Sequence, residues 1–188
     1  PGDLKVDNNY LLPVGQDKCG SNPVRLLISK NNIYASHGSG VYQFNDKRKE
    51  FINIYSLKEE RISALAAYDS VIFAGTMSGK IYRDKTQLYD AENFTTMINK
   101  IVPVNKNKVI FTAVTGELCG PLRLIGDGKS INVLSSPLSA VRDFQVYKNE
   151  VFTLENKLVG KYDWDENGNI NLANTVDIWK RRVCWKSH

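Results

Sequence analysis

Apolar and polar residues alternate along this chain in short runs that are separated by Gly, Asn and Asp. Four such runs lie within residues 24–55: VRLLI, IYAS, VYQF and FINIY. Alternation with a period of two is typical of strands with one buried face, whereas the 3.6-residue period of a helix is hard to find. The pattern therefore predicts an all-β fold made of many short strands.

The strand pattern repeats about every 40 residues. An aliphatic–aromatic pair recurs with steps of 39, 38 and 41 residues between its aromatics, which are Tyr34, Phe73, Phe111 and Phe152. Glycine followed within three positions by tyrosine recurs at residues 40–42, 79–82 and 160–162, and Ile-Asn-aliphatic at residues 52–54, 131–133 and 170–172. Repeats of this length, with four short strands each, are typical of the blades of a β-propeller.

We expect a single propeller domain over residues 1–188, built of four-stranded antiparallel blades. Full blades should cover about residues 22–60, 61–99, 100–140 and 141–180, with partial blades at residues 1–21 and 181–188. The last strand of the second blade is expected near Phe94–Met97, and the third blade from about Ile101. The partial blades either pair to close a small ring or belong to a larger ring of about six to eight blades. The larger ring is favoured, because the joined ends supply too few strands for a complete blade.

Two segments resemble blades of the WD-repeat-like propeller superfamily: IYASHGSGVYQFN at residues 33–45 and VIFAGTMSGKIYRDK at residues 71–85. Each has an aliphatic–aromatic pair, a turn of small residues and then G-x-(I/V)-Y. They also resemble blades of periplasmic sensor propellers. The chain departs from the WD-repeat pattern, since Trp-Asp occurs only at Trp164–Asp165 and no Gly-His precedes a first strand. The resemblance implies a propeller that holds other proteins.

The stretch YDWDENGNINL, residues 162–172, looks like the first half of a calcium loop. Asp163, Asp165 and Asn167 stand two apart, as the first oxygen ligands of an EF-hand do. The twelfth position is Asn174 instead of the Glu that supplies two oxygens, and both flanks are predicted strands. Asn-Gly also favours a type I′ hairpin turn. We therefore expect a turn here, with no metal and no cofactor.

Few residues suit catalysis. His37 lies in the turn SHGSG between two predicted strands, and no carboxylate nearby in sequence can orient its ring. The glycine-rich segment at residues 75–80, GTMSGK, lacks the spacing and the helix of a phosphate-binding loop. Asp143 is the one carboxylate expected on an innermost strand. These observations predict that the chain is not an enzyme.

The net charge of +5 is concentrated in part in residues 179–188, WKRRVCWKSH. Basic residues beside tryptophans can contact phosphates and stacked bases of a nucleic acid, but a final strand with a charged edge is the favoured interpretation. Such an edge can accept a β-strand from another protein subunit, and its charge suits an acidic partner segment. The candidate partner-binding residues are Lys180, Arg181, Arg182, Trp185 and His37.

The favoured function is a non-catalytic scaffold for protein–protein interaction within a larger assembly. The alternative is a sensor of a ligand or glycan in the central pocket of the ring, and a propeller enzyme is the least favoured hypothesis. No apolar run reaches the ~18 residues of a membrane span. Three cysteines, an odd number, favour an intracellular setting, cytoplasmic or nuclear. Because the first residue is Pro, a secreted or periplasmic chain that lost a leader stays open, and Asn93 would then be a glycosylation site.

Overall fold

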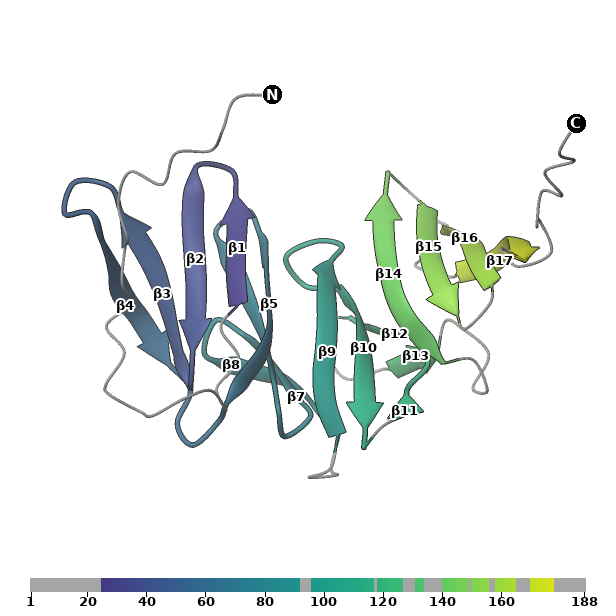
Figure 1. Ribbon diagram of the computed structural model, residues 1–188, viewed down its shortest axis with the longest axis horizontal. Coiled ribbons are helices and arrows are strands. Elements are labelled where there is room, and N and C mark those ends of the chain that lie inside the picture. Colours follow the sequence, from purple (N-terminus) through teal and green to yellow (C-terminus); the bar gives the residue numbers. More distant parts are fainter. Residues whose placement is uncertain are drawn as a thin grey trace, which may run out of the picture.

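The computed structural model describes residues 25–91, 96–116, 118–126, 131–133, 140–148, 150–155, 158–164 and 170–177. Within these residues every regular element is a strand, and the strands form four antiparallel sheets (Figure 1). Each sheet is formed by strands that are consecutive in the chain, so each is one blade. The predicted β-propeller architecture is confirmed.

The bounds of the strands follow the chain blade by blade. Blade 1 contains β1 (Arg25–Ser29), β2 (Asn32–His37), β3 (Gly40–Asn45) and β4 (Glu50–Ser56). Blade 2 contains β5 (Ile62–Tyr68), β6 (Val71–Thr76), β7 (Lys80–Arg83) and β8 (Thr86–Asp90). Blade 3 contains β9 (Thr96–Pro103), β10 (Val109–Thr115), β11 (Leu118–Cys119), β12 (Arg123–Ile125) and β13 (Ile131–Val133). Blade 4 contains β14 (Val141–Tyr147), β15 (Glu150–Glu155), β16 (Leu158–Trp164) and β17 (Ile170–Asp177).

Tight hairpins join the first two strands of blades 1, 2 and 4. Lys30, Asp69 and Lys148 occupy these turns with φ values of 52°, 55° and 55°. Positive φ in a two-residue loop matches the twist of the flanking strands, so the strands continue as a regular pair. The first two of these turns lie side by side, because Lys30 Nζ is 2.5 Å from Asp69 Oδ1.

Two features of blades 2 and 3 differ from the sequence-based expectation. The last strand of blade 2 is β8, so the expectation that this strand lies near Phe94–Met97 is wrong. Asp84, with φ 53°, turns the chain back directly after β7, and Tyr89 of β8 is buried in the core. Blade 3 consequently begins at Thr96, before the expected Ile101. Blade 3 is also irregular, since its third strand is divided into β11 and β12, which both pair with β10.

One apolar core lies between each pair of neighbouring blades, so that four blades enclose three cores. The first strands β1, β5, β9 and β14 contact one another in this order, which places them along the inner side of the arc. We call the face of a blade that points to the next blade its forward face, and the opposite one its back face. In β6, Phe73 is on the forward face and packs in the core with blade 3, whereas Ile72 and Ala74 are on the back face and pack with blade 1.

Blade 3 reverses this alternation. Phe111 is on its back face, with its ring centre 5.1 Å from that of Tyr89 in blade 2, and Ile110 is on its forward face. Shifting a strand by one residue exchanges the faces of all its side chains. Two aromatics of the repeated pair, Phe73 and Phe111, therefore share one core. Of the four recurring aromatics, Tyr34, Phe73 and Phe111 are buried between blades, while Phe152 is only half-buried.

We predict that Phe73→Ala lowers the free energy of unfolding by about 3–5 kcal/mol, because the side chain is fully buried and its removal leaves a cavity between two blades. Tyr68→Ala is the control, since Tyr68 is 38% exposed and should cost below ~1 kcal/mol. Urea denaturation followed by circular dichroism measures both. Equal midpoints for the two variants would contradict the packing described above.

Candidate functional site

The forward face of blade 4 consists of Phe152 and Leu154 from β15, Val159 from β16 and Gln145 from β14. These side chains share a face because the strand register pairs Phe152 with Gln145 and Leu154 with Val159. The opposite face carries Phe144, Val151 and Tyr162, which pack in the core with blade 3. The alternation in blade 4 is thus the same as in blade 2, and Phe152 is at the position of Phe73.

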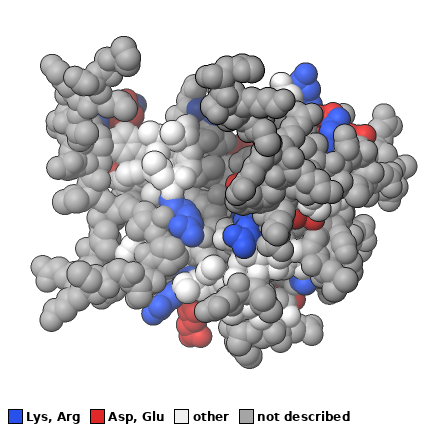
Figure 2. Space-filling model, turned by 45° about the vertical axis from the view of Figure 1, so that its right-hand side comes forward, with Lys and Arg blue, Asp and Glu red and all other residues white. Residues whose placement is uncertain are grey.

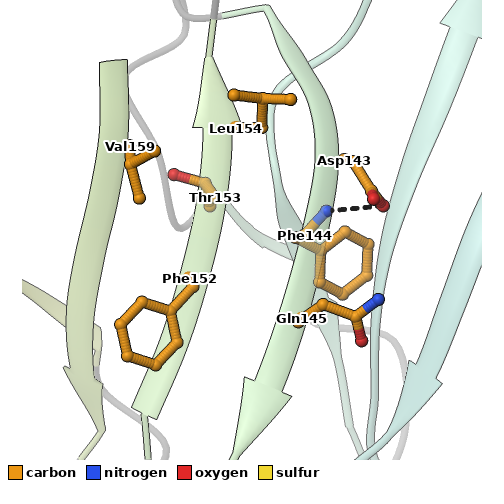
Figure 3. A pocket seen from close by; sticks show the side chains of 7 residues that line it. All are labelled: Asp143, Phe144, Gln145, Phe152, Thr153, Leu154 and Val159. Carbon is orange, nitrogen blue, oxygen red and sulfur yellow. Dashed lines mark hydrogen bonds between the residues drawn. The ribbon is translucent and has the colours of Figure 1, made fainter. Parts of the chain in front are cut away.

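A shallow pocket of about 160 Å³ lies on this face. Figure 3 shows the side chains that line it, which come from three neighbouring strands: Asp143, Phe144, Gln145, Phe152, Thr153, Leu154 and Val159. Phe152 is half-buried and Leu154 is 38% exposed, whereas Phe73 is fully buried by blade 3. The forward face of blade 4 is therefore a blade-packing surface that no described residue covers completely.

Charged residues flank the apolar part of the face. Lys161 Nζ lies 2.6 Å from Glu150 Oε1 and 3.7 Å from Asp163 Oδ1. The hydrogen bond to Glu150, with the negative charges of both carboxylates, raises the pKa of Lys161. On the other side, Lys100 Nζ lies 2.6 Å from Asp143 Oδ1 and 5.3 Å from the centre of the Phe144 ring. Asp143, the carboxylate expected on an innermost strand, thus serves to join blades 3 and 4.

The back face of the same blade holds the apolar residues in position. The Tyr162 hydroxyl donates a hydrogen bond to Glu155 Oε1 at 2.8 Å, and the Thr153 hydroxyl donates to the same atom at 2.9 Å. Burial, followed by the bond to Glu155, raises the pKa of Tyr162 to about 12. The Tyr162 ring lies over Gly160, where an added Cβ would be 2.9 Å from a ring carbon. This contact requires glycine at the centre of β16.

The basic character of the chain is not confined to residues 179–188. Figure 2 shows Lys and Arg side chains close together near the middle of one side of the molecule, with acidic side chains mostly toward its margins. Two basic side chains of the first strands join neighbouring blades: Arg25 Nε donates to the Ser63 carbonyl at 2.7 Å, and Lys100 pairs with Asp143.

The structure places His37 far from this face. His37 ends β2 in blade 1, at the opposite end of the arc from blade 4 (Figure 1). The turn that follows it stabilises the junction with blade 2, because the Ile62 amide donates to the Gly38 carbonyl at 2.8 Å. The other candidate residues, Lys180, Arg181, Arg182 and Trp185, lie outside the described residues.

Phe152 was identified from the sequence only as one of the recurring aromatics, so its place on a surface was missed. The signal that identifies Phe152 is its position in the strand, which decides the face of the sheet on which its side chain lies. It follows Tyr34 and Phe73 at the forward position, and no later blade is described that would cover it. Leu154 and Val159 carried no separate signal, because an apolar residue in a strand looks the same whether or not its face is covered.

Metal and phosphate chemistry find no support in the described part of the chain. It holds no group of three His, Cys, Asp or Glu residues that could bind a metal ion. The calcium candidate, residues 162–172, begins in β16 and ends in β17, which pair with each other, and its residues 165–169 lie outside the described residues. The segment GTMSGK is a strand–turn–strand in which Lys80 and Ser78 bond to Glu60. Among the described residues no helix is long and apolar enough to span a membrane.

No protein-family model matches the chain, and no curated protein is similar to it in sequence. Among solved structures, the computationally designed Ika8 protein matches with a TM-score of 0.59 and 21% identity over 82% of this chain and 49% of its own. The computationally designed Ika4 protein matches with a TM-score of 0.51 and 17% identity over 85% of this chain and 98% of its own. BamB from Moraxella catarrhalis matches with a TM-score of 0.48 and 12% identity over 80% of this chain and 47% of its own. The chain thus spans about half the length of Ika8, and the likeness to the designed proteins shows the fold.

We predict that Tyr162→Phe weakens the dependence of stability on alkaline pH. A pKa raised from an ordinary value near 10 to about 12 stabilises the folded chain fully below pH ~10, and this stabilisation is lost as the pH rises through about 12. Urea midpoints measured across this range should therefore fall less steeply for the variant than for the wild type. At neutral pH the variant loses roughly 1 kcal/mol with the hydrogen bond to Glu155. Parallel pH profiles would contradict the assigned role of the hydroxyl.

Proposed function

We propose that the chain is a non-catalytic scaffold for protein–protein interaction, a WD-repeat-like propeller within a larger assembly. The observation that carries the proposal is the forward face of blade 4, which has the residue pattern of a blade interface and lacks a described neighbour. The forward faces of blades 1, 2 and 3 are each covered by the sheet of the next blade. Within the molecule, equivalent faces therefore bind a polypeptide surface, namely the sheet of a neighbouring blade.

The size and chemistry of the pocket favour a protein over a small ligand or glycan. Its volume of about 160 Å³ is below the ~300–1,000 Å³ of ordinary ligand pockets. Phe152, Leu154 and Val159 offer apolar contact, while Asp143 is engaged by Lys100 and the Thr153 hydroxyl by Glu155. A glycan needs many hydrogen-bond partners, whereas an apolar centre with a charged rim is typical of protein interfaces.

The same contacts argue for a role without catalysis. A general acid or base must reach the substrate, and the carboxylate of Asp143 is held by Lys100 and by the Phe144 amide, which donates to it at 2.9 Å. Glu60 is 8% exposed and accepts hydrogen bonds from Ser78 and Lys80, so it joins β5 to the turn before β7. These acidic residues support the blades. An acidic strand that adds to residues 181–188 in an intracellular assembly remains our prediction for a further contact.

The proposal is tested by capture from a native extract with a matched pair of variants. Leu154 and Ile54 are both 38% exposed, but Ile54 lies in β4 of blade 1, away from the forward face of blade 4. We predict that proteins retained by the wild type and by Ile54→Lys are lost with Leu154→Lys, since a charge at the centre of the face opposes its desolvation. Quantitative mass spectrometry of the bound fraction measures the loss.

Retention of the same proteins by all three forms would show that this face is not the docking surface. A wild-type chain that retains no protein would contradict the scaffold function itself. Circular dichroism of each variant establishes that the fold is preserved.

A further inference from the structure

The back face of blade 1 is a second blade-packing surface without a described neighbour. Leu26 and Ile28 of β1 are 67% and 70% exposed, the largest exposures among the large apolar residues described, Tyr147 following at 61%. The same face continues across the sheet to Phe44 and Phe51, whose ring centres are 5.3 Å apart. A row of exposed aliphatic side chains beside paired aromatics is unusual for a free surface and typical of an interaction site.

This face repeats the residues of a back face that is covered. Cross-strand neighbours in the first three strands are Leu26, Ala35 and Tyr42 in blade 1, and Leu65, Ala74 and Tyr82 in blade 2. In blade 2 these residues pack against the forward face of blade 1. Ala74 and Ala35 are both buried, so the two back faces differ in their first strand, where Leu26 is 67% exposed and Leu65 is partly buried. The back face of blade 1 therefore has the side chains that the fold uses to receive a forward face.

The forward face of blade 4 likewise repeats one that is covered. Phe152 pairs with Lys161 in blade 4 as Phe73 pairs with Arg83 in blade 2, and Val159 is at the position of Ile81. In blade 2 both Phe73 and Ile81 are fully buried by blade 3. Leu154 differs from its counterpart, because it stands where blade 2 has Gly75. The two end faces, which no described residue covers completely, thus match the two halves of a blade interface except at this position.

The two faces do not meet within one chain. Blades 1 and 4 lie at opposite ends of the arc, with blades 2 and 3 between them (Figure 1), and Leu26 and Ile28 stay exposed. The match to Ika8 covers 82% of this chain and 49% of Ika8, so the matched part corresponds to about half of that longer chain. An arc of four blades therefore needs a similar number of further blades to close.

We propose that a second copy of this chain supplies them: the forward face of blade 4 in each copy packs on the back face of blade 1 in the other. The inference rests on the proposed function, because it names the protein that covers blade 4. Two copies of four blades close an eight-bladed ring, which is within the range of known propellers. The ring has two equivalent interfaces, and a head-to-tail contact that closes in this way stops at the dimer instead of growing into a filament.

The test is the mass of the chain in solution, by sedimentation velocity. One chain is 21.2 kDa, so the dimer should have twice this mass. We expect Ile28→Lys and Leu154→Lys each to be monomeric. The control is Met77→Lys, which should stay dimeric, because Met77 is 38% exposed and follows β6 in blade 2, where both faces are covered. Ile28 and Leu154 are 70% and 38% exposed, so these changes leave the cores between the blades intact, and urea midpoints check this.

Mixing the two monomeric variants tests the head-to-tail arrangement. The intact blade 4 of Ile28→Lys can pack on the intact blade 1 of Leu154→Lys, so the equimolar mixture should recover a species of twice the monomer mass. A dimer formed by Ile28→Lys alone would show that two forward faces meet, which overturns the proposal. A wild-type monomer at all concentrations overturns it as well.

These outcomes are separate from those of the scaffold function. A monomeric wild type that still loses captured proteins with Leu154→Lys would overturn the ring and leave the scaffold in place. A dimer with the predicted response to the variants that captures no other protein would support the ring and contradict the wider assembly.

Discussion

A four-stranded sheet with apolar residues on both faces must be covered on both sides, and this constraint organises the whole chain. Strand β6 shows it directly, because Phe73 packs against blade 3 while Ile72 and Ala74 pack against blade 1. Burial of apolar surface stabilises by roughly 25 cal/mol per Å², so leaving one face of a blade in water removes a large part of what holds it. A blade is stable through its neighbours, as in other repeat architectures. The back face of blade 1 and the forward face of blade 4 are the two faces that no described residue covers completely.

Hydrogen bonds add alignment to the apolar contacts between blades. The turn between β2 and β3 accepts backbone hydrogen bonds from Leu57 and Ile62, at 2.9 and 2.8 Å, and so fixes where blade 2 begins. Ser63 donates to the Ile98 carbonyl at 2.6 Å, which ties β5 to β9 inside a buried interface. Gly75 allows the same strands to approach, since an added Cβ would be 2.4 Å from Ile98 Cγ2. These contacts set the angle between blades and thereby the curvature of the arc.

The fold could be predicted from the sequence because each blade of a propeller repeats the same strands, so the same residue pattern recurs at a fixed spacing. Residue pairs such as Ile33–Tyr34 and Ile72–Phe73 recur at blade spacing, and the strands lie where the alternation indicates. The position of β8 was not predictable in this way, because TQLYD lacks the repeated Ile-Asn motif and the turn at Asp84 depends on a local positive φ. The regular spacing of the repeats also did not reveal that Phe111 lies on the back face of blade 3. A one-residue offset leaves the spacing nearly unchanged while it exchanges the faces, so periodicity locates strands and packing alone assigns their sides. The candidate site was missed for the same reason, since whether Phe152 is covered depends on which blade comes next.

Hydroxyl-radical footprinting of the wild-type chain over a dilution series tests the central claim most directly, because it reports the solvent exposure of individual side chains without any substitution. We expect Phe73 and Phe111, which are fully buried between blades, to stay protected at every concentration. The account predicts that Leu26, Ile28 and Leu154 are oxidised in dilute solution and become protected together as the concentration rises. Protection of these three residues at all dilutions would show that the end faces are already covered within one chain. Oxidation that does not change with concentration would show that the two faces do not bind each other, and either result would contradict the account.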